Sequence, residues 1–450
     1  MRKLLAEIAL TPDGWQRDVL VGIGADGRIA SVVPETQDHD AECVDILLPA
    51  LCNLHSHAFQ RAMAGLTQRR GTGDDDFWSW REAMYGFVRA LTPEDVEAIA
   101  AQLHVELLES GFAAIAEFHY LHHDLDGAVH TDPAEMSGRV AAAAATSGIG
   151  LTHLPVLYAH SDFGGKPPGE GQKRFLNDPD GFLRLRECAR AHLTRDDDGL
   201  GVAFHSLRAV TPDQMTAVLA GASDGPVHIH IAEQVREVEA CLDWSGQSPV
   251  DWLLSHVDVD ERWCLVHATH MTAEETARLA RSGAVAGLCP TTEADLGDGI
   301  FPGHTYREAG GRWGVGTDSH IRADAVGELC LLEWSQRLGE RRRNVMAEPG
   351  QSTGRHLYDS ALSGGAQALG RASGGIKTGL WADLVALDTQ HPLLSGQSGD
   401  AILDAWIFSG GRACVSDVWS AGRHVVRDGR HIRRDEIARG YRGAMTRLMA

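Results

Sequence analysis

Lysine is scarce in this chain of 450 residues, and positive charge is in short supply overall. The chain has four lysines (Lys3, Lys166, Lys173 and Lys377), and its 41 Lys and Arg residues face 62 Asp and Glu residues, for a formal net charge of -21 at pH 7. A broad basic surface that displaces counterions from a polyanion is therefore excluded, and we predict no nucleic-acid partner. Any anionic ligand must be bound by a few arginines placed locally.

Long apolar runs and paired cysteines are missing as well. No segment approaches the ~18 uninterrupted apolar residues of a membrane helix, and Glu7 interrupts the apolar start of the chain before it could form a signal sequence. We therefore predict no membrane span. The eight cysteines are scattered, with no CxxC pair, which is typical of reduced residues in a cytoplasmic protein.

Eight short apolar runs alternate with helix-like stretches through the middle of the chain, residues 49–375. Such alternation is typical of a parallel α/β fold. Eight units predict a (β/α)8 TIM-like barrel, in which catalytic groups gather at the carboxyl ends of the strands. The runs are ILLPALCNLH, FAAIAEFHY, LTHLPVLYAH, LGVAFHSL, VHIHIAE, WCLVHATH, AVAGLCPT and WGVGTDSH.

The two ends of the chain share a sequence pattern that differs from the strand–helix alternation of the middle. Residues 1–48 and 376–450 both carry strand-length pieces joined by Gly and Asp turns, and a helix-like segment closes the chain near residues 435–449. We predict that both ends build one small β-sandwich domain, flanking a continuous barrel. The longest insertion, residues 67–92, follows the first barrel strand and is expected to act as a lid.

Metal-ligand side chains end three of the predicted strands. His55 and His57 follow the first, and residues two apart in a strand point to the same side. His230 and Asp318 end two later strands. Three imidazoles and a carboxylate are ligands for a divalent ion such as zinc or iron(II). None of the four lysines falls at the end of a barrel strand, where a carboxylated lysine commonly bridges two metals, so a mononuclear site is predicted.

Proton transfer has three candidates among the strand-end residues. Glu233 stands three residues after His230, and it could either cap the following helix or protonate a leaving nitrogen. His267 could be a core histidine, but at a strand end facing the ion it is expected to orient water and stabilise developing charge. Asp318 would bind the ion and also accept a proton from the water.

Arg81 in the lid insertion and Arg208 after the fourth strand are candidates for binding carboxylates. A lone arginine is more often a solvated surface charge. Two of them near a barrel mouth in an acidic protein favour bidentate contacts with an anionic substrate. Tyr120, after the second strand, is placed to donate a hydroxyl to the same group.

With these residues placed, the chain resembles the amidohydrolase superfamily and its mononuclear deaminase branch. The stretches LCNLHSHAFQRAMAG, FWSWREAMY, AEFHYLHHD, FHSLRAV, HIHIAEQ and GTDSH are similar to the N-formimino-L-glutamate deiminases of histidine degradation. The resemblance implies hydrolysis of a formimino group to a formyl group and ammonia. It implies zinc on His55, His57, His230 and Asp318, proton transfer by Glu233 and His267, and a dicarboxylate held by Gln60, Arg81, Tyr120, His205 and Arg208.

Other readings remain open from the residues alone. Another deaminase of the same branch, acting on guanine, a pterin or an adenosine derivative, would use the same metal chemistry. A non-catalytic barrel protein is disfavoured because every ligand and proton-transfer residue is present. Zinc and iron(II) accept the same ligands, and a homodimer is expected on base rates for soluble enzymes.

Overall fold

The computed structural model describes residues 2–70 and 75–450, so the Gly-rich tip of the predicted lid, residues 71–74, lies outside the described residues. All eight predicted runs contribute strands to one parallel sheet, which confirms the barrel. Their order follows the chain, and the short β8 (Gly199–Leu200) pairs with β7 off the main path. The strands are β5 (Leu51–Asn53), β6 (Phe112–His119), β7 (Gly150–Leu157), β9 (Val202–Phe204), β10 (Val227–Ile231), β11 (Trp263–His267), β12 (Val285–Leu288) and β13 (Arg312–Val315).

Backbone contacts between the first and last strands close the barrel. Leu54 N donates to Val315 O at 3.1 Å, and Asp318 N donates to His55 O at 3.0 Å. Ser56 and Asp318 form an isolated parallel bridge. The closure lies just beyond the carboxyl ends of β5 and β13, so it brings the segment of His55 and His57 beside the segment of Asp318.

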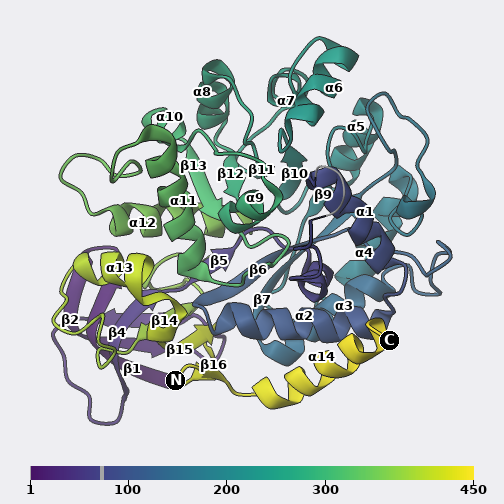
Figure 1. Cartoon of the computed structure of the whole chain (residues 1–450). Helices are drawn as coiled ribbons and strands as arrows, with labels where there is room; N and C mark the ends of the chain where they lie inside the picture. The colour runs from purple at the N-terminus through teal and green to yellow at the C-terminus, as the bar shows by residue number, and fades with distance from the viewer. Residues whose placement is uncertain (1, 71–74) are drawn as a thin grey trace.

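Helices surround the strands (Figure 1). Several begin at a proline that follows a Thr or Asp cap, as at Thr92, Asp178 and Thr211, whose side chains accept from backbone N–H groups of the first turn. The helices are α2 (Pro93–Leu108), α3 (Glu135–Ser147), α4 (Pro179–Arg190), α5 (Pro212–Gly221), α6 (Val235–Ser245), α7 (Pro249–His256), α8 (Ala273–Ser282), α9 (Pro290–Leu296), α10 (Gly303–Glu308), α11 (Ala325–Glu340) and α12 (Thr353–Ala368).

Both ends of the chain form a second, mixed sheet, as predicted. β4 joins the two ends, because it pairs parallel with β1 and antiparallel with β14. The sheet carries its own apolar core, which includes Val21, Leu384 and Trp419. Its strands are β1 (Arg2–Thr11), β2 (Gly14–Ile23), β3 (Ile29–Val33), β4 (Glu42–Pro49), β14 (Leu384–Leu387), β15 (Val415–Ser420), β16 (Arg423–Arg427) and β17 (Arg430–His431). A short α13 (Ala401–Ala405) lies between β14 and β15, and the closing helix α14 (Arg434–Leu448) runs along α2 (Figure 1).

The first predicted run, ILLPALCNLH, serves both sheets instead of one. β4 ends at Pro49 in the terminal sheet, and β5 begins at Leu51 in the barrel. Ala50 N donates to Asp383 O at 2.9 Å, so the chain passes from one sheet to the other within two residues. A continuous apolar run does not reveal such a division, because its residues are buried in both sheets.

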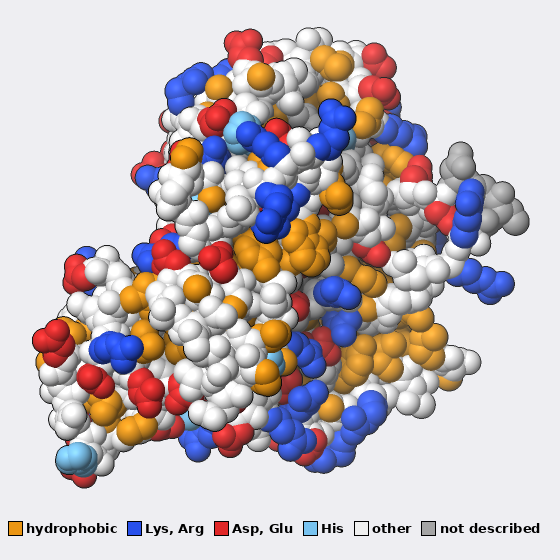
Figure 2. All heavy atoms as spheres, turned by 60° about the vertical axis from the view of Figure 1, so that its left-hand side comes forward, with side chains coloured by type: hydrophobic (Ala, Val, Ile, Leu, Met, Phe, Trp, Pro, Cys, Tyr) orange, Lys and Arg blue, Asp and Glu red, His pale blue; other side chains and the backbone are white. Residues whose placement is uncertain are grey.

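The described part of the lid insertion forms α1 (Phe77–Val88), which begins at a capping box on Asp76. Basic and acidic side chains are interspersed over the face shown in Figure 2. Among the described residues, no helix is long and apolar enough to cross a membrane.

Candidate metal centre and active site

Four buried side chains converge where the barrel closes. The Nε2 atoms of His55 and His57 lie 3.0 and 3.2 Å from His230 Nε2. Asp318 Oδ1 lies 3.4 Å from His55 Nε2 and 3.3 Å from His57 Nε2. The structure thus brings together the four residues for which the sequence predicts a metal site, in a candidate metal-binding cluster.

The donor atoms of this cluster fit a divalent ion. A tetrahedral ion with bonds of about 2.0–2.1 Å places its ligand atoms roughly 3.3 Å apart, close to the separations found here. His57 Nδ1 lies 2.8 Å from Phe118 O and His230 Nδ1 lies 2.8 Å from His205 O, so each Nδ1 carries the proton that it donates. Their Nε2 lone pairs therefore face each other, which is unfavourable unless a cation lies between them.

The electrostatic environment keeps these imidazoles neutral. Burial, with smaller contributions from neighbouring histidines, holds the pKa of His55 and His230 well below the usual range. Burial also lowers the pKa of His57, although Asp318 opposes it. Neutral imidazole is the form that binds a metal ion.

Backbone strain gathers at the strand ends that carry the site. His267, Asp318 and His320 have φ angles of 69°, 47° and 58°, and Ala232 between His230 and Glu233 has 51°. Non-glycine residues rarely adopt this left-handed region. Such backbone strain is common at functional sites, where the surrounding contacts hold the strained conformation in place. Here it turns the chain immediately after β10, β11 and β13.

A second group of side chains, which we call the acid end, lies beside the metal cluster. His267 Nε2 is 3.7 Å from Glu233 Oε1 and 3.8 Å from Asp318 Oδ2, while His267 Nδ1 is 3.3 Å from Glu293 Oε1. Burial opposes a proton on His267, but Glu233, Glu293 and Asp318 outweigh it and raise its pKa. Burial also raises the pKa of Glu233. The pair can therefore hold and pass a proton near neutral pH.

The opposite side of the pocket, the arginine end, carries guanidinium groups. Arg81 on α1 donates to Tyr85 Oη at 2.5 Å and to Tyr158 Oη at 3.4 Å. Arg208 is 6% exposed, and its Nε has no hydrogen-bond partner. Across residues 2–70 and 75–450, neither Arg81 nor Arg208 forms an ion pair with a carboxylate. Arg208 does interact electrostatically with Glu237 and Glu233 at longer range. Two guanidinium groups without a direct ion pair are poised for an anionic ligand.

The remaining predicted residues connect the two ends. Gln60 Nε2 donates to Tyr120 Oη at 2.8 Å, and Gln60 Oε1 is left without a partner. His205 packs edge-on against Tyr158 and His230, with ring centroids 4.4 and 5.1 Å apart. Burial, then Arg208 and Arg81, lowers the pKa of His205, so this ring is neutral.

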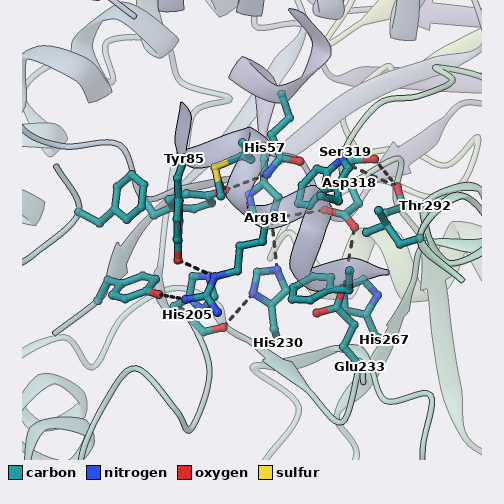
Figure 3. A pocket seen from close by; sticks show the side chains of 18 of the residues that line it. His57, Arg81, Tyr85, His205, His230, Glu233, His267, Thr292, Asp318 and Ser319 are labelled. Carbon is teal, nitrogen blue, oxygen red and sulfur yellow. Dashed lines mark hydrogen bonds and ion pairs between the residues drawn. The ribbon is translucent and has the colours of Figure 1, made fainter. Parts of the chain in front are cut away.

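Every side chain that the sequence predicts for the site lines one pocket except His55, which is fully buried. The pocket offers about 530 Å³ of space, part of which is open to solvent. Figure 3 shows the Arg81 guanidinium beside His205 on one side of His230, and Glu233 with His267 on the other. The lining includes Phe77, Trp80 and Arg81, so α1 covers the pocket.

Sequence reasoning missed several residues here. Tyr158 directly follows β7 at the same edge as the predicted ligands, so the strand-end rule that found them also points to it. Trp78 packs against three guanidinium groups, with the Cζ atoms of Arg81, Arg208 and Arg236 at 5.4, 5.4 and 4.5 Å from its ring. No sequence signal distinguishes Asp298, which follows α9 and approaches Glu233 and His267 through a loop.

Comparisons with known proteins agree with this architecture. A model described as "Amidohydrolase family" matches residues 46–425, and one described as "Formimidoylglutamate deiminase HutF, N-terminal domain" matches residues 1–42. A formimidoylglutamate deiminase from Pseudomonas aeruginosa is 53% identical over 444 residues, which are 98% of each chain.

Solved structures give the same result. The crystal structure of an amidohydrolase from Brucella melitensis has a TM-score of 0.97 at 51% identity and covers 100% of both chains. The crystal structure of an adenosine deaminase from Xanthomonas campestris with bound zinc has a TM-score of 0.83 at 22% identity, covering 99% of this chain and 98% of that chain, which is a likeness of fold. The chain belongs to the amidohydrolase family, and within it to the formimidoylglutamate deiminases.

Proposed function

We propose that this protein hydrolyses N-formimino-L-glutamate to N-formyl-L-glutamate and ammonia, a step of histidine degradation. One observation carries the proposal: a single pocket has arginines without direct ion pairs at one end and a candidate metal-binding cluster with an acid–histidine pair at the other. The substrate has the matching polarity, with two carboxylates and a formimino group. The 53% identity to a formimidoylglutamate deiminase supports the assignment.

His55, His57, His230 and Asp318 would hold the metal ion. Their chemistry suits zinc, with iron(II) as the alternative, and a zinc-containing relative of the same fold supports zinc. A divalent ion bound there would supply Lewis acidity, which makes water a nucleophile near neutral pH.

Three side chains would move protons during the reaction. Asp318, whose Oδ2 lies 3.8 Å from His267 Nε2, would take one proton from the attacking water. The water oxygen bonds to the formimino carbon, which becomes tetrahedral, while Glu233, whose pKa is raised by burial, gives its proton to the terminal nitrogen. As the carbonyl forms, the hydroxyl proton passes to the same nitrogen and the carbon–nitrogen bond breaks to release ammonia. The proton held by Asp318 then returns through His267 to Glu233.

Arg81 and Arg208 would bind the two carboxylates, with Gln60, Tyr120 and His205 as hydrogen-bonding partners. Arg208 has an unpartnered N–H group that can donate to a carboxylate, and Gln60 has an unpartnered carbonyl oxygen that can accept from an N–H group of the substrate. A neutral purine or pterin would leave these guanidinium groups unpaired and should be rejected strongly.

The cellular setting is part of the proposal. All eight cysteines are free thiols, and seven of them are not exposed, which supports a reducing compartment and hence the cytoplasm. We further propose a homodimer, which sedimentation of the purified protein would test.

Ammonia release tests the proposed function. The purified, metal-analysed protein is supplied with N-formimino-L-glutamate, with guanine and an adenosine derivative in parallel. Fast release from the formimino compound alone is expected. Release from a nucleobase alone would agree with the proposed metal chemistry but would show that the substrate assignment is wrong. If a metal-loaded sample releases ammonia from none of them, the proposed activity is wrong.

A further inference from the structure

We propose that Glu233, His267 and Asp298 form a second, weaker divalent-cation site, and that a cation bound there inhibits the enzyme. The second site lies beside the first cluster and uses different ligands. Its existence is independent of the substrate, whereas its inhibitory effect rests on the proposed function, because Glu233 and His267 are the proton-transfer pair.

The three donor atoms are already gathered. One ligand atom from each residue lies within 4.8 Å of the other two. Glu233 Oε1 and His267 Nε2 are 3.7 Å apart, near the roughly 3.3 Å expected between ligands of a tetrahedral zinc ion. They come from the loop after β10, from the end of β11 and from the segment after α9.

The ring of His267 is oriented as the rings of metal-binding histidines commonly are. Its Nδ1 forms a hydrogen bond with Glu293 Oε1 at 3.3 Å, and a carboxylate on one ring nitrogen commonly orients the other nitrogen toward a metal. Cys289 N donates to the same Glu293 oxygen at 2.8 Å, which fixes the carboxylate. When the Nδ1–H donates to Glu293, the Nε2 lone pair faces Glu233.

Asp298 supplies an oxygen that nothing else uses. Its Oδ1 accepts from Gln234 Nε2, while Oδ2 is buried and has no hydrogen-bond partner among the described residues. The residue is only 4% exposed. Its backbone is held on both sides, since Asp298 N donates to Glu293 O at 2.9 Å and His270 Nε2 donates to Asp298 O at 2.8 Å. A buried oxygen without a partner is costly unless it is protonated or binds a cation.

Buried carboxyl groups gather in this part of the pocket. They are Glu233, Glu237, Glu293, Asp298 and Asp318. Crowded, buried carboxyl groups are stabilised either by protons or by a cation. A divalent ion can take the place of protons here without a bridging carboxylated lysine, the group whose absence led the sequence to predict a mononuclear site.

Asp318 places the two sites next to each other. Its Oδ1 faces the imidazoles of His55 and His57, while its Oδ2 lies 3.8 Å from His267 Nε2. An ion on Glu233 and His267 occupies the lone pairs that those residues need for proton transfer, so turnover must stop while it is bound.

Equilibrium dialysis of the metal-free protein against increasing zinc tests the site directly. Wild type is expected to bind one tight equivalent and then a second, weaker one. Asp298→Asn should keep the first and lose the second. Asp295→Asn is the matched control: it removes the same charge from the same segment, but its carboxylate contacts Gln68 and lies outside the cluster. It should bind both equivalents.

Inhibition is measured on the same samples. Ammonia release should fall as the second equivalent binds, and the half-inhibitory zinc concentration should rise about tenfold or more in Asp298→Asn, the range seen when one group supporting a metal site is lost. A zinc anomalous difference map of wild-type crystals soaked in excess zinc should show a peak among Glu233, His267 and Asp298. The map decides the question even if Asp298→Asn does not fold.

Several results would overturn the proposal. A stoichiometry that stays at one equivalent in excess zinc removes the site, as does a second equivalent that persists in Asp298→Asn. A second equivalent that leaves ammonia release unchanged removes the inhibitory role. Failure of the proposed function is distinct, because dialysis and diffraction do not require a substrate.

Discussion

The two ends of the pocket differ in charge and in how they are built. The acid end stands on the strand ends of β10, β11 and β13, where backbone strain and hydrogen bonds fix each side chain. The arginine end depends on α1 and the loop after β9, and its guanidinium groups contact aromatic rings and hydroxyls instead of carboxylates. The residues proposed for catalysis thus lie at the strand ends of the barrel, and those proposed for substrate binding lie largely on a segment that covers the pocket.

The difference in charge between the two ends also determines the orientation in which a substrate binds. A molecule with a formimino group at one end and a side-chain carboxylate at the other gains favourable contacts in one orientation and repulsion in the other. This orientation directs the formimino carbon to the metal cluster. Changes at the acid end should therefore slow turnover, whereas changes at the arginine end should weaken binding.

The largest expected effect comes from Glu233→Gln at the acid end. The amide keeps the shape of the side chain but cannot transfer a proton, so kcat should fall about 10²- to 10⁴-fold. Zinc content should stay at the wild-type level for the first equivalent, because Glu233 is not among its ligands. Steady-state kinetics with metal analysis checks both, and a near-normal kcat would remove Glu233 from the proton-transfer pathway.

Arg208→Met should act on binding instead. Methionine keeps much of the apolar stem but removes a charge-assisted contact of roughly 1.5–3 kcal/mol, so KM should rise by about 10- to 100-fold with kcat less affected. Arg262→Met is the control and should leave KM unchanged, because this half-buried guanidinium donates to Gly225 O and does not line the pocket. An unchanged KM in Arg208→Met would place the carboxylate contacts elsewhere.

Trp78→Leu tests the arginine end without changing a residue that lines the pocket, because Trp78 contacts the arginines from outside the pocket lining. Loss of cation–π contacts worth roughly 0.5–1 kcal/mol each should raise KM several-fold at nearly constant kcat, and Trp78→Phe should recover part of the loss. Trp334→Leu, at a tryptophan 46% exposed on α11, is the matched control. A fall in kcat with unchanged KM would contradict the positioning role of Trp78.

The contrast between the two ends also explains what the sequence could reveal. His230, His267 and Asp318 were predictable because strand periodicity and the shared edge of a parallel barrel place strand-end residues together. The grouping of Arg81 with Tyr85 and Tyr158 was not, since it depends on where α1 folds back over the barrel. The eight strands and the joint terminal sheet were predicted from pattern alone.

Asp298 shows more clearly what the sequence could not predict. It lies after α9 with no periodic signal around it, and its position beside Glu233 follows from the path of one loop. The division of the first apolar run between β4 and β5 was equally hidden. Both depend on tertiary packing that local sequence does not encode.

The smallest expected effect concerns stability near the acid end. Glu328 on α11 accepts a hydrogen bond from Thr291 N at 2.9 Å, and this contact holds the start of α9, which carries Glu293. Burial raises the pKa of Glu328 to about 8. The folded state therefore keeps a proton that the unfolded chain loses near its ordinary pKa, so the free energy of unfolding falls as the pH rises from about 5 to 8 and levels off above that.

Glu328→Gln removes this pH dependence while keeping an oxygen for Thr291 N. Relative to wild type, the variant should gain roughly 1 kcal/mol or more of stability between pH 5.5 and pH 8. Urea unfolding at the two pH values measures the change. An equal stability difference at both pH values would mean that Glu328 does not keep its proton in the folded protein, and that burial does not control its ionisation as we infer.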